Sequence, residues 1–358
     1  MKRLCGAARA AAERGEARAF ALLVGIVLLV FAWNAASGAL AVPLSAFPRI
    51  FGAALGLCAP QEGDRLFAMV LLEVRLPRLC LAGAVGAILG FSGAAMQGVL
   101  RNPLAEPGLL GTSSGAALGA VAAIVLEGVL TRRHDFAPFM VPLAAFGGAM
   151  ASTVVVVAVA RAMALPSATT LLLTGIAINA LAGSAIGLLI SLANDEQLRS
   201  LTFWMMGSLA SANWVHAGVV SAVGAVSGAF VFHQALALDA TTLGDDVAGH
   251  LGLDAVAVRG RVLGAVALAV GAAVAFVGMI GFVGLVAPHL VRLMLGARHR
   301  LVIPGAMLLG AVLVMLADMA ARTVAIPAEL PLGVLTGILG GPFLLWLLLR
   351  VGRQGGAA

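Results

Sequence analysis

The sequence predicts an all-α integral membrane protein with about ten transmembrane helices. Three observations support this class: 61% of the 358 residues are hydrophobic, only 11% are charged, and the mean hydropathy is +1.07. Soluble domains contain about 45–50% apolar and about 25% charged residues. A helix that crosses a bilayer needs about 20 mostly apolar residues, because its backbone polar groups must be satisfied internally.

Ten apolar segments, separated by charged residues or by Pro and Gly, are the expected transmembrane helices. The first follows a basic N-terminus. Its apolar run from Phe20 is longer than that of a signal peptide and further spans follow, so we interpret it as an uncleaved first helix. The expected ranges are 19–41, 76–98, 108–128, 139–160, 170–192, 213–233, 260–279, 280–296, 302–321 and 333–350. The whole chain, 1–358, is expected to form a single polytopic transmembrane domain, with 45 glycines that favour close helix packing.

The distribution of basic residues favours a cytoplasmic N-terminus. In that orientation 14 Lys and Arg residues lie at cytoplasmic ends of the spans and 8 at outer ends. An even number of spans then places the C-terminus in the cytoplasm as well. The pI of about 10.8 does not indicate a nucleic-acid partner, because the arginines are scattered over helix ends and form no single patch.

Two connections are unusually long. Residues 42–75 form an outer segment with three prolines, and residues 234–259 form an acidic inner loop. Apolar residues recur in the inner loop every fourth position, at Leu243, Val247 and Leu251. This pattern predicts a short amphipathic helix that ends at Gly252. The apolar stripe either packs on the bundle or binds a partner.

Several chemistries are excluded or disfavoured. Lys2 is the only lysine, so the chain has no phosphate-binding loop of the P-loop type. The cysteines show no metal-ligand spacing and are expected to be packing residues: Cys5, Cys58 and Cys80. The predicted helix centres are almost free of charge, which disfavours an ion-coupled secondary carrier. Asp318 is interpreted as the i,i+4 partner of Arg322. An energy source on another chain is the better hypothesis.

Small and slightly polar residues follow one face of the fifth expected helix at four-residue intervals: Gly175, Asn179, Gly183 and Gly187. Such a face either packs against another helix or lines a passage for a large solute. Packing is the commoner outcome, and Asn179 favours the passage.

Four blocks of sequence resemble the FecCD permease family, the transmembrane subunits of type II ABC importers for iron–siderophores, haem and vitamin B12. The blocks are RLPRLCLAGAVGAILGFSGAAMQGVLRNPLAEPGLLGTSSGAALGA (75–120), WMMGSLASANW (204–214), GFVGLVAPHLVRLMLG (281–296) and LADMAARTVAIPAELPLGVLTGILGGPFLLWLLL (316–349). They occur in family order, and together the resemblance covers about residues 65–350. It implies the type II importer fold in a bacterial inner membrane, a homodimer, two ABC ATPase subunits and a periplasmic binding protein.

The resemblance also implies roles for particular residues. Arg75, Arg78 and Arg322 correspond to outer rim arginines that pair with glutamates of the binding protein; plain interfacial anchoring is the alternative. The inner loop corresponds to the ATPase-coupling segment, with Leu243, Asp245, Asp246, Val247, Leu251 and Asp254. Its aspartates are expected to meet basic residues of the ATPase. Asn102, Leu104, Ser167 and Thr169 match the cytoplasmic gate.

The expected cargo is haem, with vitamin B12 or a ferric siderophore as alternatives. Methionines adapt to flat apolar surfaces, and Met205 and Met206 lie in a block that is expected to face the pathway beside Gly175 and Asn179. His134 and His216 are potential iron ligands but are interpreted as helix-end or loop residues. No cofactor or metal is expected on this chain, since ATP and Mg²⁺ belong to the partner ATPase.

Overall fold

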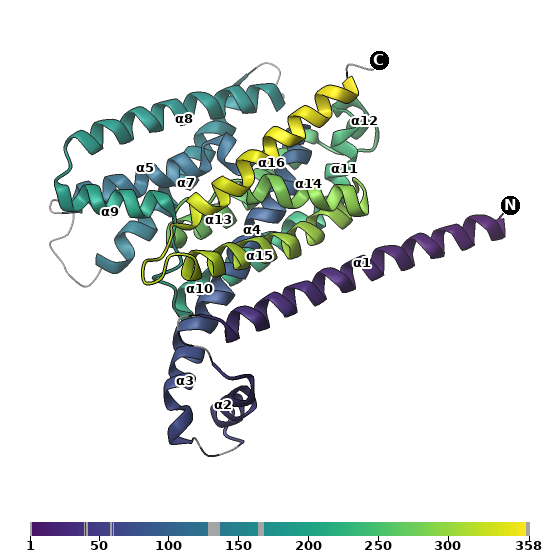
Figure 1. Ribbon diagram of the computed structural model, residues 1–358. Helices are drawn as coiled ribbons and strands as arrows, with labels where there is room; N and C mark the ends of the chain where they lie inside the picture. Colours follow the sequence, from purple (N-terminus) through teal and green to yellow (C-terminus); the bar gives the residue numbers. More distant parts are fainter. Residues whose placement is uncertain are drawn as a thin grey trace.

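The computed structural model describes residues 2–38, 40, 42–57, 59, 61–127, 137–163 and 168–355, and within these ranges it is helical with no β-strand. Each expected transmembrane segment is a helix (Figure 1). These are α1 Lys2–Ala36, α4 Leu76–Val99, α5 Thr112–Val125, α7 Ala137–Ala162, α8 Ala168–Ser191, α10 Trp214–His233, α13 Ala255–Val277, α14 Val283–Leu295, α15 His299–Thr323 and α16 Leu332–Gly355. By length and composition, 7 helices of the described chain are able to cross a membrane, and α5, α14 and α16 contribute shorter apolar stretches.

Shorter elements connect these helices. They are η1 Leu44–Ala46, α2 Phe47–Ala54, η2 Glu62–Asp64, α3 Arg65–Met69, η3 Val70–Arg75, η4 Pro107–Leu110, α9 Asp195–Met206, α11 Ala235–Thr242 and α12 Asp245–His250. Helix α4 begins at the expected residue, Leu76, but α3 and η3 of the expected outer segment continue into it, so that one apolar span runs over Arg65–Val99. A proline in an α-helix clashes with the carbonyl four residues before it, and Pro77 lies at this junction. The π-helical turn of η3 precedes the proline and relieves that clash.

Helix α4 forms the centre of the bundle. It contacts α15, α10, α14 and α13, and its span is 78% buried. A Cβ atom at Gly86 would lie 2.2 Å from the Gly310 carbonyl oxygen, and one at Gly90 would lie 2.0 Å from that of Ala306. Glycines therefore allow α4 and α15 to approach with backbone in contact, as small residues do in membrane bundles.

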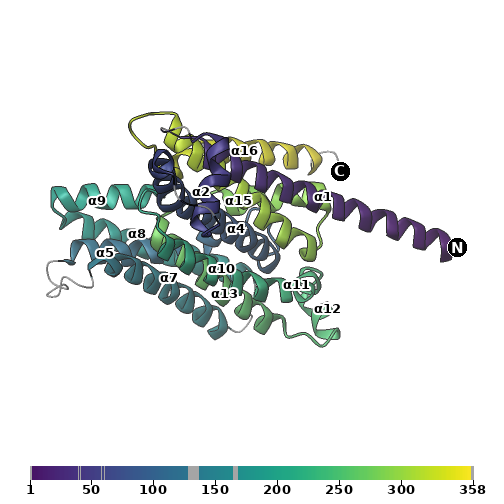
Figure 2. The ribbon, with the colours of Figure 1, turned by 90° about the horizontal axis from the view of Figure 1, so that it is seen from below.

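The bundle has two distinct ends. At the α2 end, α2 and α3 project from the body where α4 begins (Figure 1). At the α12 end lie α11 and α12, and the first residues of α1 and the last of α16 extend toward the same side in both views (Figure 2). The described chain therefore begins and finishes on one side of the bundle, which is the arrangement that an even number of spans requires.

Candidate functional site

The α2 end contains a buried cluster of charges that links α4 to α15. Arg78 of α4 donates from Nε to Asp318 of α15 at 2.9 Å, and it holds both carboxylate oxygens of Glu329 at 3.0 and 2.9 Å. Asp318 is fully buried at 0% exposure. Glu329 lies in the connection between α15 and α16, and the hydrogen bond from Arg78 lowers the pKa of its carboxyl. The guanidinium of Arg78 thus joins two helices and one loop.

Arg322 occupies the other side of Asp318. Its Nε donates to Asp318 at 3.1 Å, which confirms the i,i+4 pair expected from the sequence. Its Nη2 also donates to Asn34 of α1, and Asn34 donates in turn to the Met315 carbonyl at 2.9 Å. One buried carboxylate therefore receives two arginines, and the second arginine fixes α1 against α15.

The side chain of Arg75 caps the C-terminal end of α1. Its guanidinium donates to the carbonyls of Ala35 at 2.8 Å and Ala36 at 3.1 Å, and to that of Leu40. A Cβ atom at Gly38 would lie 2.7 Å from Nη2 of Arg75, so glycine is needed where the chain leaves the helix. Arg75 and Arg78 are only 5% and 8% exposed, so within this chain both are held as internal links, and the docking role expected for them stays a prediction. An arginine with several acceptors inside its own chain is held as an internal link.

The α12 end contains a second charge cluster. Asp245, the first residue of α12, accepts hydrogen bonds from Arg259 of α13 at 3.0 and 2.7 Å and from Arg101 after α4. Arg101 also donates to the Thr241 carbonyl at 2.8 Å. The hydrogen bond from Arg259 is the largest cause of the lowered pKa of Asp245. These contacts tie the short helix α12 to two longer helices.

Two of the three aspartates expected to contact the ATPase thus have partners within the chain. Besides Asp245, Asp254 caps α13 by accepting from the backbone N–H groups of Val256 at 2.9 Å and Ala257 at 3.0 Å. These contacts account for the charges of Asp245 and Asp254 without basic residues of an ATPase. Asp246, by contrast, is exposed on α12.

The predicted apolar stripe lies on the surface. Leu243 is 72% exposed, Val247 40% and Leu251 64%, whereas Ala248 of α12 is fully buried. The helix ends at His250, and Gly252 follows with a φ of +75°. The alternative in which the stripe packs on the bundle is therefore wrong for this chain. Leu243 and Leu251 flank α12 and Val247 lies on it, and together these exposed side chains form a surface suited to an apolar groove of a partner.

The expected gate residues lie in two segments. Asn102 accepts from the backbone N–H of Leu104 at 2.9 Å, which closes a compact turn between α4 and η4. Thr169 is exposed in the first turn of α8. Ser167 lies outside the described residues, as do Cys58 and His134.

The small face of α8 divides into a packed part and an open part. A Cβ atom at Gly175 would lie 2.2 Å from the Leu109 carbonyl oxygen. Asn179 accepts from Ser114 Oγ and donates to the Gly108 carbonyl at 3.2 Å. No heavy atom lies within 4 Å of a Cβ placed at Gly183 or Gly187. Packing therefore explains the first half of the face, and the second half is open.

The remaining expected residues lie away from this face. Met205 and Met206 end α9, with Met206 36% exposed. The ring of His216 packs on Phe276 at a centroid distance of 4.6 Å, consistent with a helix-end residue. No group of three or more His, Cys, Asp or Glu residues that could hold a metal ion occurs in the described chain.

Two features of the sites were not predicted from the sequence. Glu329 and Asn34 complete the α2-end cluster, and His299 bonds Asp239 at 2.6 Å to fasten α11 to the start of α15. Each pair is separated by tens to hundreds of positions along the chain, so no local spacing indicates it. Of these residues, only Glu329 had a recognisable sequence context, since it lies in a loop between two prolines.

The structure is a polytopic bundle of apolar helices, with a buried charge cluster at one end and exposed apolar side chains around a short helix at the other, which is the architecture of an integral membrane protein. The chain belongs to the FecCD transport family, whose model matches residues 26–350. The members are transmembrane permease subunits of ABC importers, which are non-catalytic components.

Individual relatives agree with this assignment. The hemin transport system permease protein HmuU of Yersinia pestis is 46% identical over 283 residues, covering 79% of this chain and 84% of the relative. The vitamin B12 import system permease protein BtuC of Vibrio vulnificus is 41% identical over 281 residues, covering 78% and 83%. A solved structure described as an inward-facing conformation of a metal-chelate type ABC transporter has a TM-score of 0.80 and 28% identity, covering 92% and 97%.

Proposed function

We propose that this chain forms the translocation pathway for haem in an ATP-driven importer of a bacterial inner membrane, with both termini cytoplasmic. The observation that carries the proposal is the 46% identity to a hemin permease over 79% of the chain. Vitamin B12 is the second candidate, since several relatives import it and one is 41% identical. A ferric siderophore is the third, by the likeness to a metal-chelate type transporter. The chain itself binds no cofactor in this proposal.

The α12 end is the proposed contact with two copies of an ABC ATPase, which bind ATP and Mg²⁺. Support comes from the exposure of Val247 on α12 and of Leu243 and Leu251 on either side of it, with the helix anchored at its start by Asp245. An anchored helix transmits the movement of the ATPase to α13 and α4, whereas a free loop would not. The two permease copies then alternate between outward-open and inward-open states, each stabilised by different contacts with the partners.

The α2 end is the proposed contact with a periplasmic binding protein. Since Arg75 is enclosed by backbone carbonyls, Arg78 and Arg322 are the arginines that remain for docking. The side chain of Glu329 is 42% exposed, against 1% for Asp318. A carboxylate of the binding protein is therefore expected to replace Glu329 on Arg78 while Asp318 stays in place. Such a replacement favours register and encounter more than affinity.

The proposed complex contains two copies of this chain, which face each other across the pathway. Support comes from α8, whose span is only 17% buried, and from the open, exposed positions Gly183 and Gly187. A cysteine at Gly183 in a background without native cysteines should crosslink two copies, and one at the lipid-exposed Val226 of α10 should not.

Reconstituted uptake tests the function. Proteoliposomes that contain this chain, its ATPase and its binding protein should accumulate haem on ATP addition, and cobalamin and a ferric siderophore at most weakly. Preferential uptake of either alternative would replace haem as the cargo. Uptake driven by an ion gradient without the ATPase would instead identify a secondary carrier and overturn the proposal.

A further inference from the structure

A groove runs along α7 and α13 at the α12 end of the bundle. Two adjoining cavities of about 20 and 270 Å³ share Val157, Arg161 and Gly260. The first continues to Leu171 of α8, and the second continues down the bundle past Val154. Apart from Arg161 and the buried Arg259, nearly all of the lining is apolar, and Val154 is 60% exposed on the outside of α7.

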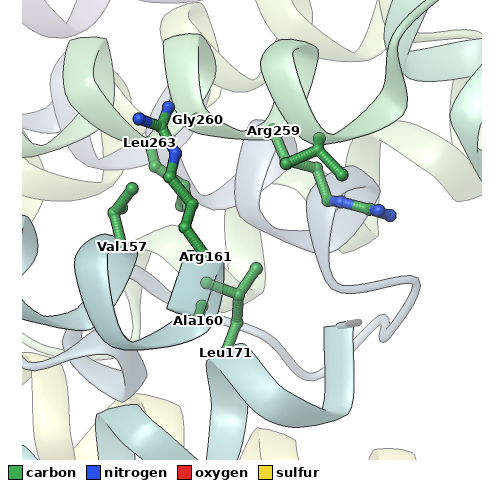
Figure 3. A pocket seen from close by; sticks show the side chains of 8 residues that line it. Val157, Ala160, Arg161, Leu171, Arg259, Gly260 and Leu263 are labelled. Carbon is green, nitrogen blue, oxygen red and sulfur yellow. The ribbon is translucent and has the colours of Figure 1, made fainter. Parts of the chain in front are cut away.

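Glycines on α13 create the space. Figure 3 shows the side chain of Arg161 extending from the end of α7 toward Gly260, while Arg259 points away from it. A Cβ atom at Gly260 would lie 2.7 Å from Nη2 of Arg161, so the guanidinium rests directly on the α13 backbone. One turn further along, a Cβ atom at Gly264 would have no heavy atom within 4 Å. The groove is therefore open below the charge.

The mouth of the groove carries positive charge that this part of the described chain does not neutralise. The carboxylates of the region are engaged elsewhere: Asp245 binds Arg259, and Asp254 caps α13. Arg161 forms no ion pair with a described residue, and its side chain is exposed. Arg261, also exposed, donates only to the Ala257 carbonyl. An anion is the missing partner.

We propose that this groove binds an anionic phospholipid, with the phosphate on Arg161 and one acyl chain along Val157, Val154 and Gly264. A guanidinium offers a planar set of donors that matches phosphate oxygens. Basic pockets between transmembrane helices near one face of the bilayer take acidic lipid headgroups. The apolar lining below the charge distinguishes a lipid from a free phosphate, which would have no use for it. The bound lipid would join α7 to α13, the helix whose Arg259 binds Asp245.

Lipid retention by the purified full chain provides the test. Native mass spectrometry of protein purified from a membrane of phosphatidylglycerol and phosphatidylethanolamine should show retained phosphatidylglycerol. Arg161→Ala should reduce that retention about tenfold, as expected for loss of a hydrogen-bonded charge pair. Arg161→Lys should retain an intermediate amount. The matched control is Arg300→Ala, which removes an exposed arginine of the same end and should have no effect.

A second variant tests the groove without touching the charge. Gly264→Leu fills the open space and should also reduce phosphatidylglycerol retention, while leaving folding intact because nothing lies within 4 Å of the new Cβ atom. Equal retention by wild type and Arg161→Ala would overturn the proposal. So would displacement by millimolar inorganic phosphate with no effect of Gly264→Leu, since that result identifies a soluble anion site.

Discussion

The two ends of the bundle use the same charge arrangement in different surroundings. At the α2 end, Asp318 lies between Arg78 and Arg322, and at the α12 end Asp245 lies between Arg101 and Arg259. The side chain of Asp318 is 1% exposed and that of Asp245 is 44% exposed. The first carboxylate joins membrane-spanning helices, whereas the second fastens a short helix outside them.

This difference in burial determines what each cluster can do. Breaking a buried ion pair leaves an uncompensated charge and costs about 3–5 kcal/mol. An exposed pair contributes about 0.2–1 kcal/mol, because water and salt screen it. The α2-end cluster is therefore a fixed structural link with one exchangeable member, Glu329. The α12-end cluster is intermediate, since Asp245 and Arg101 meet water while Arg259 is buried, so it is a tether for α12 that opens at a lower cost than the α2-end cluster.

The largest effect is expected from Asp318→Ala. Two buried arginines would lose their shared carboxylate, so the variant should unfold more easily by about 3–5 kcal/mol. Thermal unfolding in detergent, followed by size-exclusion chromatography, measures the loss. The matched control is Asp246→Ala at the exposed surface of α12, which should unfold like wild type. Equal unfolding temperatures for the two variants would contradict the fixed link.

A large functional effect without loss of stability is expected from Leu243→Asp combined with Leu251→Asp. Both side chains are exposed, so the fold is retained, but charge on the apolar stripe should weaken ATPase binding at least about tenfold. Pull-down of the ATPase and ATP-driven uptake measure it. The control is Val226→Ala, which changes an exposed apolar side chain of α10. Undisturbed ATPase binding would show that the stripe is not the coupling surface.

A moderate gain is expected from Glu329→Gln. Without the charge of Glu329, the Nη1 and Nη2 groups of Arg78 would be available to a carboxylate of the binding protein. The affinity for the binding protein should therefore rise by up to about tenfold. Biolayer interferometry on the reconstituted chain measures the change. Thr323→Ala, in the neighbouring helix turn, controls for general disturbance. If Glu329→Gln binds as wild type does, Arg78 is not the docking group, and the importer function is unaffected by that result.

The smallest effect is expected from pH at Asp245. The folded-state pKa of this group lies below its ordinary value, so its contribution to stability is complete above about pH 4. It is lost only as the pH falls through the lower, folded-state pKa. The protection of the α12 amides, measured relative to their intrinsic exchange rates at each pH, should therefore be unchanged between pH 5 and pH 8. Asp245→Asn should lower this protection throughout that range, by about fivefold or less. Lower protection of wild-type α12 at pH 6 than at pH 8 would contradict the tether.

The sequence predicted the helices well because apolar length is a local property. Residues 65–75 are the exception: they were expected to belong to the outer segment, whereas α3 and η3 are helical and continue into α4. The stripe of Leu243, Val247 and Leu251 was also recognisable, because four-residue spacing defines a helix face. The surroundings of the arginines were not, since Arg78 meets Glu329 only after the chain has crossed the bundle many times.

The sequence by itself determined the membrane class, the helical segments and the absence of a P-loop lysine, and its four motif blocks carried the family resemblance. The class and the segments could be predicted because a bilayer requires each span to satisfy its own backbone, and this requirement is visible in every apolar segment. Tertiary structure alone decided which charges are internal links, which face of α8 is packed and where an arginine lacks a carboxylate. Those outcomes depend on burial and on contacts between distant residues, and the desolvation of a charge is set by its neighbours in space.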